Sequence, residues 1–199
     1  MPSATELLPK YLQTNRLTLE LLNQEDPKHM ACMLGALNNP TAHQRMGDFG
    51  IRTPAELIAL HLKTRLKSPI LLDRDLIYVI HVGNENGPLA GPVTMAQRKP
   101  AIPGDIGWAL LEEYMGKGYA TEAAREFLRF LREDFGLKDI ITWPEETNRQ
   151  SNRVAEKLGF VDGGRIKNAD EPGKMVAIWI LPGMSRLDEN LSISFWPES

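Results

Sequence analysis

The chain has 199 residues and a single cysteine, Cys32, so no disulfide can form within it. A lack of disulfides is typical of a reducing compartment, and we expect a cytoplasmic protein in which Cys32 is a small buried residue. No apolar run approaches the about 18 residues that cross a membrane, and residues 1–10 lack the basic start and apolar stretch of a signal peptide. We therefore expect no membrane partner.

The chain also lacks a surplus of positive charge, because it has 23 lysine and arginine residues and 26 aspartate and glutamate residues. Nucleic-acid-binding proteins normally carry a basic surplus, so we expect no nucleic-acid partner. The four histidines have no paired-ligand spacing and no cysteine cluster, which predicts no bound metal. No GxSxG elbow is present, which argues against a Ser-His-Asp hydrolase. The slight acidity favours a cationic substrate such as an amine.

Hydrophobic residues make up 42% of the chain, enough for one domain with a core. Apolar periodicity, capping boxes and proline at first helical positions predict strands and helices along it. The expected strands are 16–21, 76–82, 89–97, 105–110, 139–143, 160–162 and 175–181, and the expected helices are 27–37, 53–66, 120 to a cap at Gly136, and 148–158. We expect a loop at 41–52. The domain should span 14–182, with an N-terminal arm at 1–13 and a C-terminal arm at 183–199 that holds an extra strand or a packed segment. This order predicts a mixed α/β (α+β) domain.

A glycine-rich segment, Gly116-Lys117-Gly118, joins an expected strand to the helix that begins near Ala120. The first turn of a helix has amide hydrogens without internal partners, and they carry partial positive charge. Glycines let an anion approach this backbone, while Lys117 and Thr121 add a cation and a hydroxyl. The segment predicts a phosphate cradle, although a plain glycine-rich turn has the same composition. The Walker motif GxxxxGK[ST] and the dinucleotide fingerprint GxGxxG are both absent.

Three segments resemble motifs of the GNAT superfamily of N-acetyltransferases, in the family's order and spacing. They are Asp105-Ile106-Gly107-Trp108, Gly116-Lys117-Gly118-Tyr119-Ala120-Thr121-Glu122-Ala123, and the stretch from Asn148 to Phe160. By element order the resemblance extends over residues 14–182, and the branch it resembles contains ribosomal-protein N-terminal acetyltransferases. The resemblance implies the GNAT fold, with a central, mostly antiparallel twisted sheet that is splayed at the coenzyme site and flanked by helices.

The resemblance also implies that acetyl-coenzyme A is the co-substrate. Its diphosphate would lie on the amides of the glycine loop, and its pantetheine arm would pair with the preceding strand as an added strand does. One residue departs from the family's loop, because Met115 stands where a polar side chain is usual. The implied coenzyme-binding residues are Ala109, Leu110, Leu111, Gly116, Lys117, Gly118, Tyr119, Ala120, Thr121, Asn148 and Asn152.

Two catalytic residues are implied for direct attack of an amine on the thioester in a ternary complex. Asp105 stands where relatives often carry an acid that takes the amine proton, and a strand-end carboxylate bonded to nearby amides is the alternative. Ser151 would bond the departing sulfur, unless its helix face is simply solvated. In the family, the loop that corresponds to 43–52 commonly shapes the acceptor pocket.

The implied partners are acetyl-coenzyme A and an amine, which is a small molecule or a protein N-terminus, with the chain a monomer or homodimer. Two other functions stay open at this point. One is a catalytically weak coenzyme-binding sensor or scaffold, and the other is a transferase of a longer acyl group.

Overall fold

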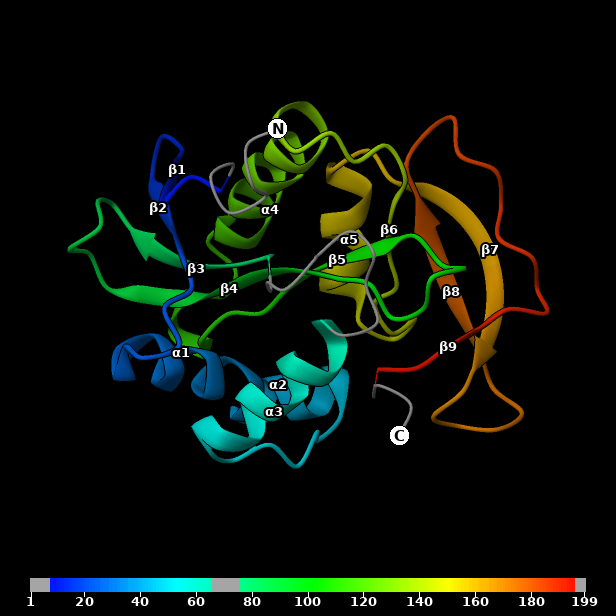
Figure 1. The fold of residues 1–199 in the computed structure, drawn as a ribbon, viewed down its shortest axis with the longest axis horizontal. Helices are drawn as coiled ribbons and strands as arrows, with labels where there is room; N and C mark the ends of the chain where they lie inside the picture. The colour runs from blue at the N-terminus through cyan, green and yellow to red at the C-terminus, as the bar shows by residue number, and fades with distance from the viewer. Residues whose placement is uncertain (1–7, 66–75, 196–199) are drawn as a thin grey trace.

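The computed structural model describes residues 8–65 and 76–195, with side chains up to residue 60 in the first range. Within these ranges the strands form one nine-stranded sheet, in the order β1-β2-β3-β4-β5-β6-β8-β7-β9 (Figure 1). The strands are β1 Tyr11–Gln13, β2 Leu17–Leu21, β3 Leu76–Val82, β4 Leu89–Ala96, β5 Gly104–Trp108, β6 Ile140–Thr142, β7 Val161–Asn168, β8 Met175–Ile180 and β9 Ser192–Ile193. Neighbouring strands are antiparallel except in the pairs β5–β6 and β7–β9. The predicted mixed α/β class with a mostly antiparallel sheet is confirmed.

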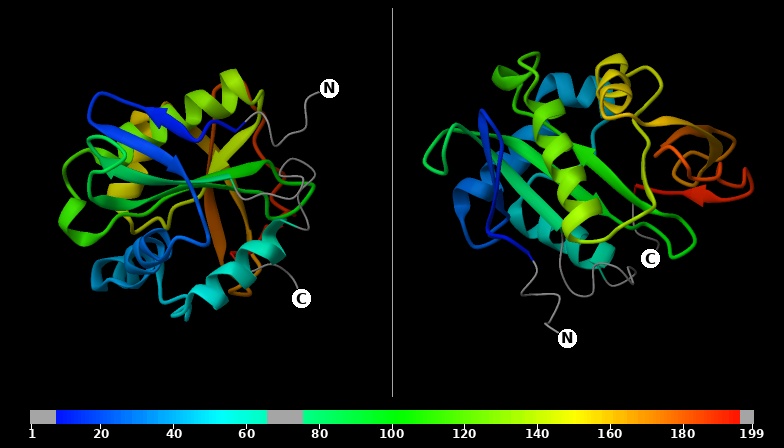
Figure 2. Two further views of the ribbon diagram at one scale, coloured as in Figure 1. Left: turned by 60° about the vertical axis from the view of Figure 1, so that its left-hand side comes forward. Right: turned by 90° about the horizontal axis from the view of Figure 1, so that it is seen from above.

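Helices cover both faces of this sheet, with α1, α2 and α3 on one face and α4 and α5 on the other (Figures 1 and 2). The helices are α1 Pro27–Asn38, α2 Pro40–Met46, α3 Pro54–Arg65, α4 Tyr119–Arg129 and α5 Arg149–Lys157, with a 3-10 turn at Glu112–Tyr114 and a π-helical turn at Phe130–Asp134. Three of them begin with proline, whose fixed φ suits the first helical position. None of the described helices is long and apolar enough to span a membrane.

The central strand β3 shows why both faces need a cover. Tyr78 and Ile80 pack with Phe127 of α4 in one core cluster. The alternate residues, Ile77 and Val79, pack with residues of α1 and α3 in a second cluster. Because side chains of a strand point alternately to opposite faces, a strand that is buried on both reads as one continuous apolar run.

Strands β5 and β6 pair only where both begin. The parallel pairing joins Gly104 to Ile140 and Asp105 to Ile141. Further along, β5 pairs with β4 alone, with Trp108 opposite Val93, while β6 pairs with β8. The two strands therefore diverge toward their carboxyl ends, which is the splay expected at a coenzyme site.

The structure differs from the sequence-based expectation in the N-terminal arm and in one loop. β1 lies in the expected N-terminal arm and is paired within the sheet. In the C-terminal arm, β9 is the extra strand that was one of the two expected alternatives. The expectation of a loop at 41–52 is wrong in its first half, where α2 lies. The Asn39 side chain accepts the amide hydrogen of Ala42, and Pro40 follows it, so Asn39 ends α1 and also caps α2.

Candidate active site

Two cavities meet where β5 and β6 diverge. The loop cavity, of about 280 Å³, lies over the segment between β5 and α4. The sheet cavity, of about 420 Å³, is lined by β4, β5, the α2–α3 segment and the C-terminal segment. Residues that line both cavities mark the place where their contents can react with each other, and they are Met46, Trp108, Ala109, Asn148 and Ser151.

Glycines shape the loop cavity at the start of α4. Gly116 and Gly118 have φ angles of 76° and 82°, which residues with side chains rarely adopt. A β-carbon placed on Gly116 would meet no atom within 4 Å, so this backbone borders open space. Gly118 is the N-cap of α4 and has no side chain to bond the free amides of the first turn. The loop therefore presents amide hydrogens and the positive end of the helix dipole, which suit an anion.

Most of the predicted coenzyme-binding residues line this loop cavity. They are Ala109, Leu110, Gly116, Gly118, Tyr119, Ala120, Thr121 and Asn148. Met115 also lines it, and its sulfur lies 3.5 Å from Nη1 of Arg45. The position that departs from the family's loop therefore contacts a cation supplied by α2.

Two other residues predicted for the coenzyme, Leu111 and Lys117, do not line the cavity. Leu111 donates its amide to the Ala90 carbonyl at 2.8 Å and so extends the pairing of β5 with β4. The Lys117 ammonium lies over the Tyr114 ring, 5.4 Å from its centroid. In this structure both residues hold the loop in place rather than face its cavity.

Asn152 is likewise absent from the lining of both cavities. Its Nδ2 donates to the carbonyls of Glu145 and Asn148, each at 2.9 Å, and its Oδ1 accepts from Trp179 Nε1 at 3.0 Å. The amide thus bonds the segment before α5 to β8. The helical spacing placed Asn152 next to Ser151, but it did not reveal these internal partners.

Arg16 is a supporting residue that the sequence did not reveal. Its Nε lies 2.7 Å from Oε2 of Glu122 in the first turn of α4, and its Nη1 donates to the Lys117 carbonyl at 3.2 Å. The guanidinium also lies over the Tyr119 ring, 5.0 Å from the centroid. Arg16 precedes β2 and is 106 positions from Glu122, so no local pattern could indicate this contact.

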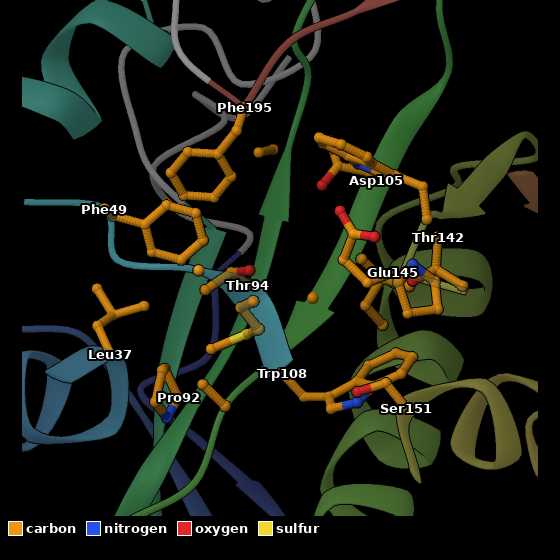
Figure 3. Close-up of a pocket in the computed structure, with 18 of the residues that line it drawn as sticks. Leu37, Phe49, Pro92, Thr94, Asp105, Trp108, Thr142, Glu145, Ser151 and Phe195 are labelled. Carbon is orange, nitrogen blue, oxygen red and sulfur yellow. The ribbon is translucent and has the colours of Figure 1, made fainter. Parts of the chain in front are cut away.

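The sheet cavity has an aromatic side and an acidic side. Figure 3 shows Phe49 and Phe195 on one side and Asp105 and Glu145 on the other. The two phenylalanine rings stack with centroids 4.0 Å apart and 13° between their planes. The other apolar side chains of the lining are Met33, Leu37, Met46, Leu57, Leu60, Ile77, Pro92, Met95, Ala96, Ile106, Trp108, Ala109, Trp143 and Pro144. Phe49 lies in the segment 43–52 that was expected to shape an acceptor pocket.

The two cavities differ in charge. Within the described residues, the loop cavity is lined by the cations Arg45, Arg153 and Lys157 and by no carboxylate. The sheet cavity is lined by one cation, Arg98, and by the carboxylates Asp48, Asp105, Glu145, Asp170 and Glu171. An anionic ligand suits the first cavity and a cationic ligand suits the second.

The Asp105 carboxylate is bound on both of its oxygens by Arg98. Nε lies 2.9 Å from Oδ1, and Nη2 lies 3.3 Å from Oδ2. Arg98 Nη1 also donates to the Phe195 carbonyl at 2.6 Å, and the guanidinium lies over the ring of the same residue. Asp105 does line the sheet cavity as expected, but it is neither a free base nor a carboxylate bonded to nearby amides. This arginine partner changes the role we propose for it below.

Ser151 lies in the first turn of α5, at the junction of the two cavities. Its amide donates to Oδ1 of Asn148 at 3.1 Å, so Asn148 is the N-cap of this helix. Within the described part of the chain, its hydroxyl makes no hydrogen bond. Of the neighbouring residues on this helix, Val154 lines the loop cavity and Ala155 is fully buried.

A second polar cluster, Glu20, His29 and His81, lies outside both cavities and brings one ligand-type atom of each residue within 4.8 Å of the others. Nδ1 of His29 accepts the Asn23 amide hydrogen at 3.1 Å, so a neutral ring carries its proton on Nε2. That nitrogen then has no lone pair to offer a metal ion. It lies 3.6 Å from Oε2 of Glu20, an oxygen that is hydrogen-bonded to Nε2 of His81 at 3.0 Å. Burial lowers the pKa of His29, which favours this neutral form.

Comparison with known proteins agrees with this geometry. A family model described as an acetyltransferase (GNAT) domain matches residues 16–161. Among curated proteins, the uncharacterized N-acetyltransferase YnaD of Bacillus subtilis is 35% identical over 69 residues, which are 35% of this chain and 41% of that protein. The alignment thus spans less than half of that relative.

Two solved structures show how far the likeness in fold extends. An acetyltransferase from Agrobacterium tumefaciens strain C58 has a TM-score of 0.67 at 23% identity, over 87% of this chain and 94% of the other. The microcin C7 self-immunity acetyltransferase MccE, solved in complex with acetyl-CoA and AMP, has a TM-score of 0.65 at 20% identity, over 88% of this chain and 98% of the other. At these identities the likeness concerns the fold.

Proposed function

Because the chain belongs to the GNAT acetyltransferase family, we propose that it transfers the acetyl group of acetyl-coenzyme A to the nitrogen of an amine. The family match over residues 16–161 supports this class of reaction. The structural neighbour solved with acetyl-CoA supports the identity of the acetyl donor. The single cysteine supports a cytoplasmic site of action.

One observation carries the proposal, namely that two cavities of opposite charge meet at shared residues. The phosphates of the coenzyme would lie in the loop cavity, among the free amides of α4 and the cations Arg45, Arg153 and Lys157. An ammonium group would enter the sheet cavity, whose lining has five carboxylates and one cation, Arg98. The thioester carbon would then lie near Ser151, which borders both cavities.

The proposed reaction is a direct attack within the ternary complex. A carboxylate takes one proton from the ammonium group, and the freed lone pair forms a bond to the thioester carbonyl carbon. The carbon–sulfur bond breaks, and its electron pair leaves on sulfur. The second proton that nitrogen loses goes to the thiolate, which gives an amide and the free thiol. Holding both substrates in one site supplies much of the rate.

The main chain after β5 is placed to polarise the thioester. Ala109 and Leu111 donate their amides to the carbonyls of Pro92 and Ala90. Since amides of an extended strand alternate in direction, the Leu110 amide is directed to the open side left by the splay. We propose that this amide binds the developing oxyanion and that the Ser151 hydroxyl binds the departing sulfur.

Calorimetry with acetyl-coenzyme A, followed by mass spectrometry of products from a panel of amines, tests this function. We expect binding and at least one N-acetylated product. Binding with no product from any amine would instead favour a coenzyme-binding sensor. Absence of binding would overturn the proposed function, and faster transfer from a hexanoyl donor than from acetyl-coenzyme A would favour a longer acyl group.

A further inference from the structure

On the premise of the acetyl transfer proposed above, we infer that the acceptor is a monoamine with an apolar body and that Glu145 receives its ammonium group. The sheet cavity offers five carboxylates to a cation: Asp48, Asp105, Glu145, Asp170 and Glu171. Among the residues that the structure describes, four of these side chains have partners, and the fifth makes no hydrogen bond or ion pair. The identity of the free carboxylate fixes where the cationic end of the acceptor lies.

Two of the carboxylates are neutralised by arginine. Asp48 lies 2.5 Å from the Arg52 guanidinium, and this bond lowers the pKa of Asp48 to about 2. Asp105 is bound on both oxygens by Arg98, with less than a fifth of either side chain exposed. A substrate ammonium would have to compete with a guanidinium at either site.

The two carboxylates that lie between β7 and β8 are also occupied. Glu171 forms an ion pair with Lys174. Asp170 accepts hydrogen bonds from the Ser194 hydroxyl at 2.5 Å and from the Phe195 amide at 2.7 Å, and so fixes the segment after β9. Glu171 therefore already holds a cation, and both oxygens of Asp170 are occupied by hydrogen bonds from the segment after β9.

Glu145 differs from the other four. Its carbonyl accepts hydrogen bonds from Asn152 Nδ2 and from the Asn148 amide, each at 2.9 Å, so its backbone is fixed. Its side chain is exposed and, within the described part of the chain, makes no hydrogen bond or ion pair. Its charge also raises the pKa of Lys174, but less than Glu171 does, to which that ammonium is already bonded. Glu145 is therefore a positioned, unpaired carboxylate on the acidic side of the cavity (Figure 3).

The opposite side of the cavity determines the rest of the acceptor. It is formed by the stacked rings of Phe49 and Phe195 and by aliphatic side chains such as Leu37 and Leu57. The carboxylates that adjoin these rings, Asp48 and Asp170, already bond Arg52 and the segment after β9. A second ammonium group placed against the rings would therefore lose water without gaining an unoccupied carboxylate, which is costly. A cavity of about 420 Å³ lies in the size range of small-molecule sites. The acceptor is therefore a small molecule with one cationic end and an aromatic or branched apolar body.

The same carboxylate serves the chemistry. A primary alkylamine has a pKa near the about 10.4 of lysine, so it reaches the site protonated. The ammonium proton passes to Glu145, the nitrogen lone pair attacks the thioester carbon, and the carbon–sulfur bond breaks with its electrons on sulfur. The second nitrogen proton neutralises the thiolate, and Glu145 returns its proton to solvent.

Steady-state kinetics with three acceptors test the inference: 2-phenylethylamine, spermidine and a short alanine-terminated peptide. We expect kcat/KM for 2-phenylethylamine to exceed the other two by about tenfold or more. Glu145→Gln should lower that value about thirtyfold or more near pH 7, because a paired charge is lost. Partial recovery is expected at pH 9.5, where more of the amine is already deprotonated.

Glu146→Gln is the matched control, because Glu146 neighbours Glu145 and pairs with Arg165 at 2.8 Å, but does not line the cavity. It should keep the wild-type rate, and both variants should bind coenzyme A as the wild type does. Equal rates in the two variants, faster acetylation of spermidine or the peptide, or no acetylation of 2-phenylethylamine would each overturn the inference. Any of these three results would leave the proposed function standing, provided that the wild type binds the coenzyme and acetylates another amine. If the wild type did not bind the coenzyme, the proposed function itself would be overturned.

Discussion

Arg98 and Asp105 form a nearly buried ion pair with two hydrogen bonds, and 14% and 7% of the two side chains are exposed. The same guanidinium binds the Phe195 carbonyl and lies over the Phe195 ring. One arginine therefore connects the start of β5 to the C-terminal segment across the sheet cavity. We propose that Asp105 is a positioning residue, which holds Arg98 and through it the aromatic side of the cavity.

Asp105→Asn should destabilise the fold, because the Arg98 guanidinium would stay buried without its counter-charge. We expect a loss of about 3 kcal/mol in the free energy of unfolding, measured with urea. Asp139→Asn, an exposed aspartate just before β6, should change the stability little. Adding Arg98→Met to Asp105→Asn should recover part of the loss, and a double variant no more stable than Asp105→Asn would show that the pair is not coupled.

Gly118→Glu should abolish binding of acetyl-coenzyme A, because it puts a negative side chain at the N-cap of α4 where the diphosphate is expected. Gly136→Glu is a suitable control, since Gly136 has a similar φ of 85°. A β-carbon there would meet no atom within 4 Å, and one on Gly118 would make only an ordinary contact with Nη2 of Arg16 at 3.4 Å. Both variants carry the same backbone strain and charge. Calorimetry should show lost affinity in Gly118→Glu alone, and equal affinities would remove the phosphate site from this loop.

The parts of the site that local patterns predict are those built from local backbone. The glycine loop, its place between a strand and a helix, and the cap at Asn148 all follow from residues close together in sequence. Cys32, expected to be small and buried, is 5% exposed, and burial raises its pKa to about 12. A thiol with that pKa is no nucleophile at neutral pH.

Long-range contacts could not be predicted in this way. The bonds from Arg16 to α4 and from Arg98 to the C-terminal segment join residues about a hundred positions apart. Whether a polar side chain faces a cavity or bonds its own chain depends on such partners, and this is why Asn152 and Asp105 differ from expectation. The sequence analysis did not select Glu145, because its distinction is that it has no side-chain partner among the described residues, whereas the other carboxylates of the cavity do. That comparison requires the long-range contacts of all five.

Ser151→Ala should lower kcat by about tenfold to a hundredfold, the effect of one lost transition-state hydrogen bond of about 1.4–2.7 kcal/mol. The dissociation constant of the coenzyme should stay the same, because the cap at Asn148 bonds the Ser151 main chain and not its hydroxyl. Ser185→Ala, an exposed serine outside both cavities, serves as the control. An unchanged kcat in Ser151→Ala would leave catalysis to positioning alone.

His29 should make the stability of the fold depend on pH. Burial lowers its folded-state pKa below the ordinary value of 6.5, despite the opposing charges of Asp26 and Glu20. The unfolded chain therefore binds the proton more tightly, so this contribution to stability is complete above about pH 6.5 and is lost as the pH falls toward the folded-state pKa.

In His29→Asn an amide oxygen can still accept the Asn23 hydrogen bond, but the new side chain does not titrate. Urea unfolding should show a less stable variant at pH 8 and a smaller difference from the wild type at pH 5.5. A constant difference between His29→Asn and the wild type at both pH values would show that His29 is not the titrating group.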